Sequence, residues 1–391
     1  MQPYWRLAAT YGLFFGTLGA FVPYWSVYLQ QQGLGPEQIG ICLGLFMATR
    51  IVAPNLVAWW SYGSKHPRRW LLGITLTTLI GFSFSLWRQD YLSLLLMMAW
   101  FGLGWHALLP QIESLTLGHL GSARYGQIRL WGSLGFIVTV TGFGYVLAHW
   151  YSVQTLPVLL FGLLLLLGLI LLSLPPAPHT DSKLQTLDAI GAVLRRKVVV
   201  GFIVAGFLAQ ASHAPYYAFY SLLLEQYGYD RVQIGHLWAL GVVAEIGVFA
   251  AMHRICGRYP LRSLFMLSLA LTALRWLLIG TGVAWLTILV LAQILHAASF
   301  GLYHATAMQF IEQHFQGRNR QTGQAVYNSL GFGAGGAVGN LISGYLWRYD
   351  PLTTYWVAAG TALLSLWVTW RWVDEGTPRH CASALLPPER P

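Results

Sequence analysis

The chain has 391 residues, of which 56% are hydrophobic and 9% are charged, and its mean hydropathy is +0.54. Soluble domains carry about 25% charged residues, so the composition excludes an ordinary soluble protein and indicates an all-α protein that crosses a membrane many times. The formal net charge is +10. Such a charge can indicate a nucleic-acid partner, but the positions of the basic residues, given below, indicate membrane topology instead.

Apolar runs long enough to cross a bilayer recur along the whole chain. A span needs about 20 apolar residues at about 1.5 Å rise per residue. We read the first run as a span and not as a removed leader, because its apolar part at 7–29 is too long for a signal peptide. Twelve spans are predicted, at 5–29, 37–60, 70–87, 91–117, 127–149, 155–174, 198–224, 232–253, 263–283, 284–309, 322–347 and 354–373.

The loops are short except after the sixth span, which ends at Pro175 and Pro176. Apolar residues then recur at helical spacing, which is typical of an amphipathic helix on the membrane face, although a plain tether fits equally well. These residues are Leu184, Leu187, Ile190 and Leu194. We therefore expect an N-terminal six-helix bundle at 1–174, a cytoplasmic linker at 175–197, a C-terminal six-helix bundle at 198–373 and a cytoplasmic tail at 374–391.

Most basic residues fall on one side of the predicted spans. The opposite loops hold only Arg88, Arg231 and Arg348. Under the positive-inside rule, this asymmetry predicts a multi-pass membrane protein with both termini in the cytoplasm. The charge then reflects topology, and we expect no nucleic-acid partner. The 17 residues of the basic side, out of 23 Lys and Arg, are Arg6, Lys65, Arg68, Arg69, Arg124, Lys183, Arg195, Arg196, Lys197, Arg254, Arg258, Arg262, Arg318, Arg320, Arg371, Arg379 and Arg390.

Short motifs repeat between the two halves of the chain in the same order. Gln38-Ile39-Gly40 in the second span matches Gln233-Ile234-Gly235 in the eighth, and Ser133-Leu134-Gly135-Phe136 matches Ser329-Leu330-Gly331-Phe332. Such internal symmetry is typical of a transporter built from two related bundles, with its substrate near the midplane between them.

Five ionisable side chains besides histidines lie within predicted spans. A charge at this depth costs several kcal/mol, which makes each one a functional-site candidate. Ion pairs that only hold helices together are the alternative reading, and it is equally favoured for the two residues that can pair across the 118–126 loop. The five are Arg50, Glu113, Arg129, Glu245 and Arg275.

The predicted roles follow from depth and chemistry. Glu245 is the proposed proton carrier, because loss of hydration favours the protonated carboxyl. His296 is the next candidate, as a proton relay or hydrogen-bond donor, and Arg275 lies at a similar depth. Three arginines against two glutamates favour an anionic substrate, and aromatic residues in or beside the same spans suit a small aromatic carboxylate. The predicted substrate-binding residues are Arg50, Glu113, Arg129, Trp131, Tyr24, Tyr217 and His213.

Cofactor, metal and enzyme sites are not predicted. The three cysteines, Cys42, Cys256 and Cys381, show no metal-ligand spacing. The glycine pattern at 331–336 matches a dinucleotide fingerprint but lies inside an apolar helix with no preceding strand. Its Gly335 and Gly339 instead predict close helix packing. All six Asp residues fall in loops or tails, so an integral-membrane enzyme has little chemistry available.

Several motifs resemble the major facilitator superfamily, and within it the 3-phenylpropionic acid transporter group, which is related to the lactose and nucleoside proton symporters. They span nearly all twelve predicted helices. The motifs are Phe21-Val22-Pro23-Tyr24-Trp25-Ser26-Val27-Tyr28, Gly33-Leu34-Gly35-Pro36-Glu37-Gln38-Ile39-Gly40, Leu109-Pro110-Gln111-Ile112-Glu113, Tyr125-Gly126-Gln127-Ile128-Arg129-Leu130-Trp131-Gly132-Ser133, His213-Ala214-Pro215-Tyr216-Tyr217, Leu237 to Glu245, Arg275-Trp276 and Gln293-Ile294-Leu295-His296. The resemblance also implies a location in the bacterial inner membrane.

The resemblance implies alternating access, with an acidic residue and an arginine in spans four and five for substrate, and Glu, Arg and His in spans eight, nine and ten for proton coupling. Glu113, Arg129, Glu245, Arg275 and His296 fall on those spans. Two departures stand out. The 63–69 loop lacks the Asp-Arg of the usual loop signature, and Ser299, not an acidic residue, lies three positions after His296.

We therefore expect a monomeric, proton-coupled importer of a small organic anion such as 3-phenylpropionate, with the lipid bilayer as its other partner. A sugar or nucleoside proton symporter, or a drug exporter, is the alternative on the same fold. A receptor that binds without transporting, and a membrane enzyme, remain the less favoured classes.

Overall fold

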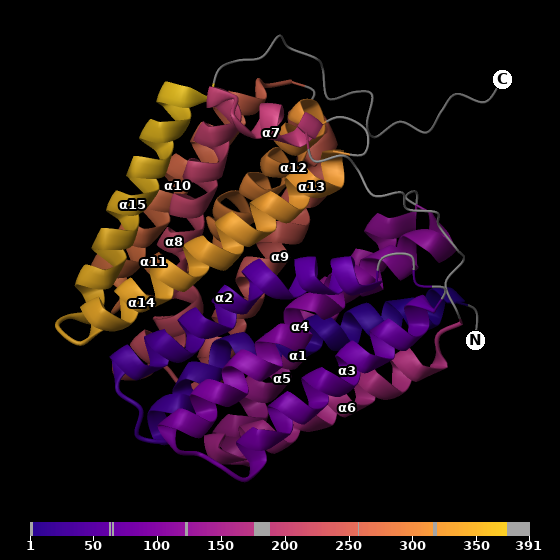
Figure 1. The fold of residues 1–391 in the computed structure, drawn as a ribbon. Coiled ribbons are helices and arrows are strands. Elements are labelled where there is room, and N and C mark those ends of the chain that lie inside the picture. Colours follow the sequence, from indigo (N-terminus) through magenta and orange to yellow (C-terminus); the bar gives the residue numbers. More distant parts are fainter. Residues whose placement is uncertain are drawn as a thin grey trace. The chain divides into compact units, whose positions relative to one another are not determined.

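A computed structural model gives the fold of the chain (Figure 1), and it describes residues 3–61, 64, 66–121, 124–175, 188–256, 258–315 and 319–373. Nearly all of these residues are helical, and no strand occurs among them. Eleven of the helices are long and apolar enough to cross a membrane. The expected all-α membrane fold is therefore confirmed.

The helix bounds agree with the predicted spans to within a few residues. Short 3-10 turns at Phe84–Leu86 and Val153–Thr155 extend the third and sixth spans. The helices are α1 (Pro3–Gln31), α2 (Pro36–Ser61), α3 (Pro67–Ser83), α4 (Tyr91–Leu120), α5 (Tyr125–His149), α6 (Leu156–Ser173), α7 (Asp188–Leu194), α8 (Lys197–Gln226), α9 (Arg231–Cys256), α10 (Leu261–Gly282), α11 (Leu286–Ile294), α12 (Tyr303–His314), α13 (Asn319–Val326), α14 (Gly336–Trp347) and α15 (Pro351–Trp372).

Two of the predicted spans are not continuous α-helices. The span expected at 284–309 consists of α11, a π-helical segment at Ala297–Leu302 and α12, and the span expected at 322–347 contains a second π-helical segment at Tyr327–Gly335. A π-helix shifts its hydrogen bonds by one residue and is frequent at functional sites. Hydropathy cannot distinguish it from an α-helix because both are equally apolar.

The chain forms two compact units. The first comprises Met1–Lys183, Ala214–Ala239 and Gly336–Pro351, and the second comprises Leu184–His213, Leu240–Gly335 and Leu352–Pro391. The division at 174 and 198 stays a prediction, as does the amphipathic linker, of which the structure describes α7. The predicted tail at 374–391 and the basic residues Lys65, Lys183, Arg318, Arg379 and Arg390 lie outside the described residues.

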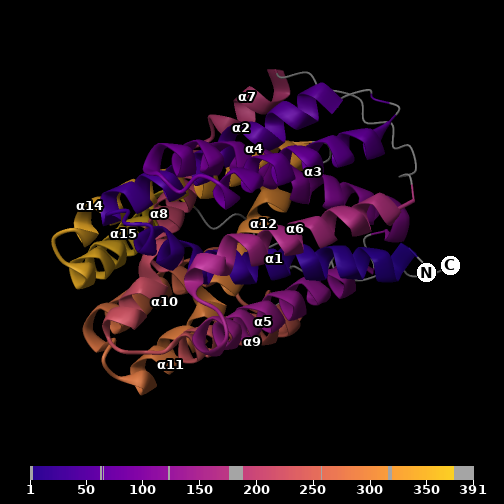
Figure 2. The ribbon, with the colours of Figure 1, turned by 90° about the horizontal axis from the view of Figure 1, so that it is seen from below.

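Glycines set the closest helix contacts of the first unit. A Cβ added to Gly19 of α1 would lie 2.6 Å from the Phe136 carbonyl oxygen of α5, and one added to Gly135 would lie 2.1 Å from the Gly12 oxygen. The two helices run side by side over much of their length (Figure 2). Small residues allow such approach in a membrane, where packing replaces the hydrophobic effect between helices.

A second close contact in this unit joins segments that are far apart in the sequence. A Cβ on Gly40 of α2 would lie 2.9 Å from the Gly344 Cα of α14. Beyond that contact, the Glu37 carboxylate lies 2.8 Å from the Arg348 guanidinium. The contact holds α14 alongside α2 (Figure 1).

Polar groups secure several helix ends. The Asp90 carboxylate accepts a hydrogen bond from the Ser93 backbone at 3.0 Å and caps α4, and hydrogen bonds from Ser93 hold the pKa of Asp90 below its usual range. In the first unit the Arg68 guanidinium donates to the Leu172 carbonyl near the end of α6. A positive charge near a helix C-terminus also interacts favourably with the negative end of the helix dipole.

Aromatic packing forms the core of the second unit. Phe202 of α8 stacks on Phe310 of α12 with ring centroids 4.1 Å apart, and Phe265 of α10 stacks on Tyr303 at 5.2 Å. The Ser365 hydroxyl of α15 donates to the Ala205 carbonyl of α8 at 2.8 Å. Gly335 lies against the Phe207 backbone, as expected for a close-packing glycine.

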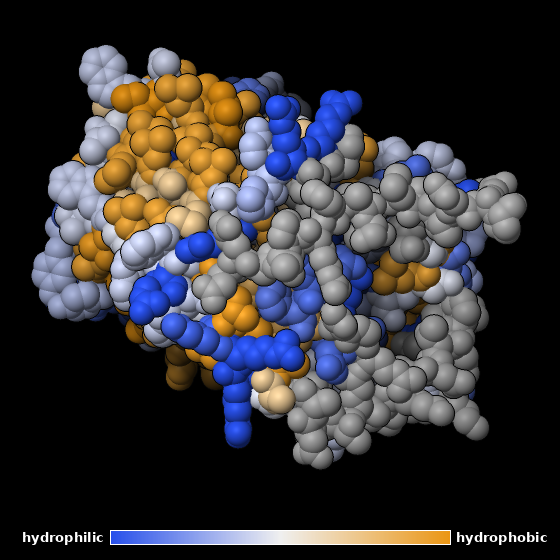
Figure 3. Space-filling model, turned by 90° about the horizontal axis from the view of Figure 1, so that it is seen from above, coloured by the Kyte–Doolittle hydropathy of each residue, from blue (hydrophilic) through white to orange (hydrophobic). Residues whose placement is uncertain are grey.

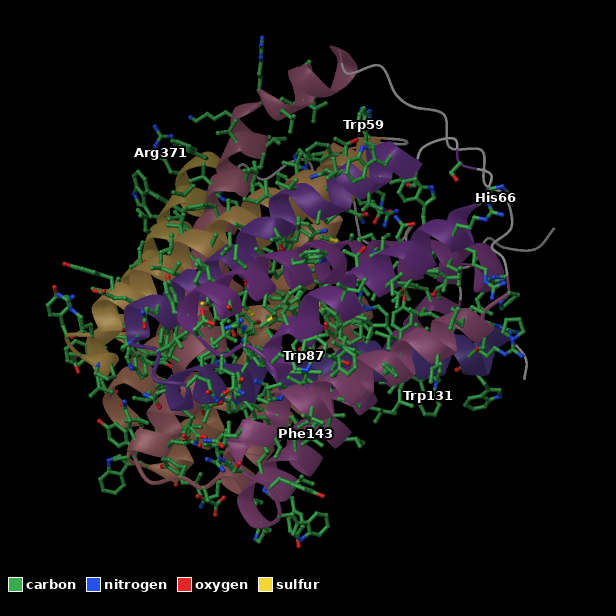
Figure 4. All side chains as sticks on the ribbon, turned by 60° about the horizontal axis from the view of Figure 1, so that its bottom comes forward. Trp59, His66, Trp87, Trp131, Phe143 and Arg371 are labelled. Carbon is green, nitrogen blue, oxygen red and sulfur yellow. The ribbon has the colours of Figure 1, made fainter. Side chains whose placement is uncertain are left out.

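Large apolar side chains point outward, as lipid contact requires. Trp59 near the end of α2 (Figure 4) and Trp87 directly after the 84–86 turn are exposed. Tryptophan is enriched at membrane interfaces. On the face shown in Figure 3, a broad apolar area (orange) borders hydrophilic side chains (blue). An apolar patch of this kind indicates contact with lipid in a membrane protein.

Gly135→Ala should lower the free energy of unfolding by about 1–3 kcal/mol, because overpacking a tight contact forces the backbones of α1 and α5 apart. Gly142→Ala, on the same helix with open space around its Cβ, is the matched control and should leave stability unchanged. Thermal unfolding in detergent measures both. Equal melting temperatures would contradict the packing described for α1 and α5.

Candidate functional site

Arg275 is fully buried in the middle of α10, in the second unit. Its Nε donates to the Ala292 carbonyl at 3.0 Å, and its two terminal nitrogens donate to the Ser299 hydroxyl at 3.2 Å and the Gln293 side-chain oxygen at 3.3 Å. The guanidinium also lies over the Trp276 ring, 4.7 Å from its centroid. We call Arg275, Gln293 and Ser299 the Arg275 network.

The Arg275 network continues into α8 through Trp276. The Trp276 indole N–H donates to the Ser212 hydroxyl at 3.3 Å, and the His213 ring meets the indole edge-on at 5.0 Å. His213 Nδ1 lies 2.7 Å from the Ala209 carbonyl oxygen and is buried. The structure therefore places His213, a predicted substrate ligand, beside the proton-coupling candidate Arg275.

Glu245 and His296 form the second part of this site. Glu245 Oε2 of α9 lies 3.8 Å from His296 Nε2, which is an ion pair when the imidazole is protonated. Glycine allows α9 to come this close, since a Cβ on Gly241 would lie 3.1 Å from the His296 ring and one on Gly301 would lie 3.2 Å from Glu245 Cγ.

The pair is linked to the Arg275 network along one helix. Gln293 lies three residues before His296, and the Ser299 hydroxyl donates to the His296 carbonyl at 3.4 Å while it accepts from Arg275. The π-helical segment begins at Ala297, directly after His296. The Ser299 hydroxyl thus links the Arg275 guanidinium to the backbone at His296.

Glu113 and Arg129 meet in the first unit, as their positions across the 118–126 loop predict. Arg129 donates to Glu113 Oε1 at 3.0 Å, and Tyr125 donates to the same oxygen at 2.7 Å. The Phe15 ring lies 5.7 Å from the guanidinium carbon. The side chains of Arg129 and Glu113 are 41% and 29% exposed, so neither is fully enclosed by protein.

Arg50 lies on α2 next to a buried histidine contact in the same unit. The Thr49 hydroxyl lies 2.9 Å from His106 Nδ1, and the His106 ring lies against Phe46 at 4.5 Å. Arg50 follows directly on α2 and is half-buried. A Cβ added to Gly102 of α4 would lie 2.5 Å from the Thr49 hydroxyl oxygen, so α2 and α4 pack closely beside Arg50.

The predicted aromatic ligands lie in different surroundings. Tyr24 is buried in the contact of α1 with α5, where its hydroxyl donates to the Val140 carbonyl at 2.8 Å. Trp131 (Figure 4) is 37% exposed, and its ring centroid lies 5.6 Å from that of Trp5. Tyr217 lies in an aromatic group with Tyr216 and Trp238. The site roles of these three residues stay predictions.

Sequence reasoning missed four polar or aromatic members of these sites: Tyr125, Gln293, Ser299 and Trp276. Helical spacing offered a signal for three of them. Tyr125 precedes Arg129 by four residues, while Gln293 and Ser299 lie three residues either side of His296, and such spacing places side chains on one face. Trp276 gave no such signal, because residues next to each other in a helix do not share a face. The Arg275 guanidinium reaches the Trp276 ring only because its side chain bends back over it.

No group of three or more His, Cys, Asp or Glu residues in the described part of the chain is arranged to hold a metal ion.

Comparison with known proteins places these features in context. The model of the MFS_1 like family matches residues 4–358. The chain is 30% identical to the "Probable 3-phenylpropionic acid transporter" of Escherichia coli (strain K12) over 370 residues, covering 93% of this chain and 96% of that protein. It is 27% identical to the "Maltose permease" of Geobacillus stearothermophilus over 344 residues, covering 86% of each.

Solved structures show the same fold. The nucleoside transporter NupG aligns with a TM-score of 0.82 at 18% sequence identity, covering 96% of this chain and all of that one.

Arg275→Lys should lower the free energy of unfolding by about 1–3 kcal/mol, because one ammonium cannot replace the three directed donors and leaves a buried acceptor unpaired. Arg371→Lys, at the exposed end of α15 (Figure 4), is the matched control and should change stability by less than about 0.5 kcal/mol. Thermal unfolding of the purified variants measures both. If the two melt together, Arg275 does not hold the second unit as described.

Proposed function

We propose that this chain, which belongs to the MFS_1 like family, is a proton symporter that imports a small organic anion, such as 3-phenylpropionate, by alternating access. Its family and its fold neighbours make it a secondary transporter of the major facilitator superfamily and not an enzyme. It is a multi-pass membrane protein that moves a small molecule. We further propose a bacterial inner-membrane location with cytoplasmic termini, and a monomer.

The observation that carries proton coupling is the contact of Glu245 with His296 beside the Arg275 network. Both side chains are largely shielded from solvent inside helices that cross the membrane. A carboxylate there is stable only while a cation or hydrogen-bond donor compensates its charge. Protonation of Glu245 removes that requirement and frees His296, so binding of a proton changes the contact of α9 with the start of the π-helical segment.

The Arg275 network transmits this change in our proposal. Arg275 holds the backbone of α11 at Ala292 and both flanks of His296 through Gln293 and Ser299. A proton that enters with a monoanion carries no net charge across the membrane, so the pH gradient drives the step, at about 1.4 kcal/mol for each tenfold difference in proton concentration. Ser299 supplies an oxygen to Arg275 at the position where related symporters are expected to carry an acidic residue.

Arg129 is the proposed anchor for the substrate carboxylate. It is accessible, it already binds one carboxylate oxygen of Glu113, and its planar fork suits bidentate binding. The Phe15 ring beside it offers a surface for an aromatic group. The name of the Escherichia coli relative agrees with such a substrate. Arg50 adds a second positive charge in the same unit.

A sugar or nucleoside symporter is the second candidate. The similarity to a maltose permease favours it, as does the nucleoside transporter among the fold neighbours. Glu113 could then accept hydrogen bonds from solute hydroxyls. A drug exporter on the same fold is a further alternative, which the direction of flux separates from an importer.

Cells that express the protein should accumulate labelled 3-phenylpropionate in preference to maltose and nucleosides, and a protonophore should abolish the accumulation. Cells without the protein provide the background, which matters because a protonated carboxylic acid crosses membranes unaided. Accumulation of a sugar or nucleoside in its place would favour the second candidate. Accumulation that survives the protonophore would contradict proton coupling.

Glu245→Gln should abolish accumulation driven by a proton gradient yet retain exchange of solute across the membrane, because the amide mimics the protonated carboxyl and cannot release a proton. Glu312→Gln provides the control, since Glu312 pairs with Arg320 at an exposed site of the same unit. Uptake and counterflow in proteoliposomes separate the two activities. Active uptake at the wild-type level in Glu245→Gln would remove Glu245 as the proton site.

A further inference from the structure

The first unit carries a surface groove that plays no part in the site described above. It lies where α2, α3 and α4 meet and encloses about 540 Å³, a volume within the range of about 300–1,000 Å³ that is typical of small-ligand pockets. Its lining includes Trp60, Arg69, Trp70, Gly73, Ile74 and Leu103.

Two glycines shape the groove: Gly104 lets α3 and α4 pack closely at its floor, and Gly73 leaves its opening clear. Gly104 of α4 presses on α3, since a Cβ there would lie 2.3 Å from the Thr78 hydroxyl and 2.8 Å from its backbone nitrogen. Gly73 of α3 is the opposite case, because a Cβ added to it meets no atom within 4 Å. The absent side chain at position 73 thus keeps the groove open.

Charge is confined to one end of the groove. Arg69 lines it next to Trp60 and Trp70, and the remainder is lined almost entirely by apolar side chains. The neighbouring Arg68 donates to the Leu172 carbonyl of α6, whereas Arg69 is exposed. The sequence from 56 to 77 contains no acidic residue, so nothing in that stretch opposes the positive charge.

The dimensions match one leaflet of a bilayer. Arg69 and Thr77, which both line the groove, are eight residues apart on α3, or about 12 Å along a helix. Half of a hydrocarbon core is about 15 Å thick. Tryptophans mark the level of lipid headgroups, so the apolar part lies at the depth of acyl chains and Arg69 lies at the depth of the phosphates.

We propose that this groove binds an anionic phospholipid, with one acyl chain along Ile74 and Leu103 and the phosphate on the Arg69 guanidinium. Basic pockets between transmembrane helices are suited to anionic headgroups. The apolar floor suits a lipid chain better than a polar solute. The site is independent of the proposed substrate and proton sites, and its failure would leave them unaffected.

The test uses the purified full-length protein, with bound lipids counted by native mass spectrometry during titration with phosphatidylglycerol or phosphatidylcholine. The wild type should retain phosphatidylglycerol in preference to phosphatidylcholine. Arg69→Gln should reduce that preference by about fivefold, the effect of one arginine at a lipid surface. Arg371→Gln, exposed at the end of α15, is the matched control and should keep the preference.

Gly73→Leu should fill the groove and remove one bound lipid of either kind without loss of stability, because the new side chain meets open space. Gly162→Leu on α6, which also meets open space, should retain the lipid. Unchanged lipid retention in both Arg69→Gln and Gly73→Leu would overturn the proposal. So would an equal loss in Gly162→Leu, or a change in oligomeric mass in Gly73→Leu, which would identify the groove as an interface between copies.

Discussion

Charge inside a lipid-embedded helix persists only where protein atoms replace the water that it has lost, and this constraint organises the second unit. Arg275 satisfies it with one backbone carbonyl, two neutral side-chain oxygens and the face of Trp276. Those groups come from α10, α11 and the π-helical segment that follows His296. One buried guanidinium therefore fixes the helix that carries His296, and with it the distance to Glu245.

Neutral partners have a consequence for coupling. Because Gln293 and Ser299 cannot change their charge, their contacts with Arg275 stay available whether Glu245 is protonated or not. In the proposed mechanism the proton binds at the contact of Glu245 with His296, whose side chains lie 3.8 Å apart, while Arg275 keeps its own hydrogen bonds. In the first unit the arrangement differs, since Arg129 meets a carboxylate directly and both groups are accessible. Accessible charge suits solute binding, whereas shielded charge suits proton transfer.

The class of fold and most helix bounds were predictable from the sequence, because hydropathy is a strong signal. The rarity of charge in spans singled out the ionisable candidates, whose roles stay predictions. Spacing across a short loop was enough to predict the ion pair of Glu113 with Arg129. The partners of Arg275 were only partly predictable. Gln293 and Ser299 lie at helical spacing from His296, but Ala292 contributes a backbone oxygen and Ser299 lies on a π-helical turn. Hydropathy does not report either feature. Hydropathy also could not distinguish Tyr24, whose hydroxyl donates to the Val140 carbonyl of α5, from an aromatic residue that contacts solute.

Proton movement with the solute is the central claim of this account, and the pH outside lightly buffered proteoliposomes measures it most directly. On addition of 3-phenylpropionate, the account predicts that external pH rises faster with the wild-type protein than with protein-free liposomes, and that Glu245→Gln reduces the rise to the protein-free rate. Solute entry without any protein-dependent rise in pH, or an undiminished rise in Glu245→Gln, would contradict it.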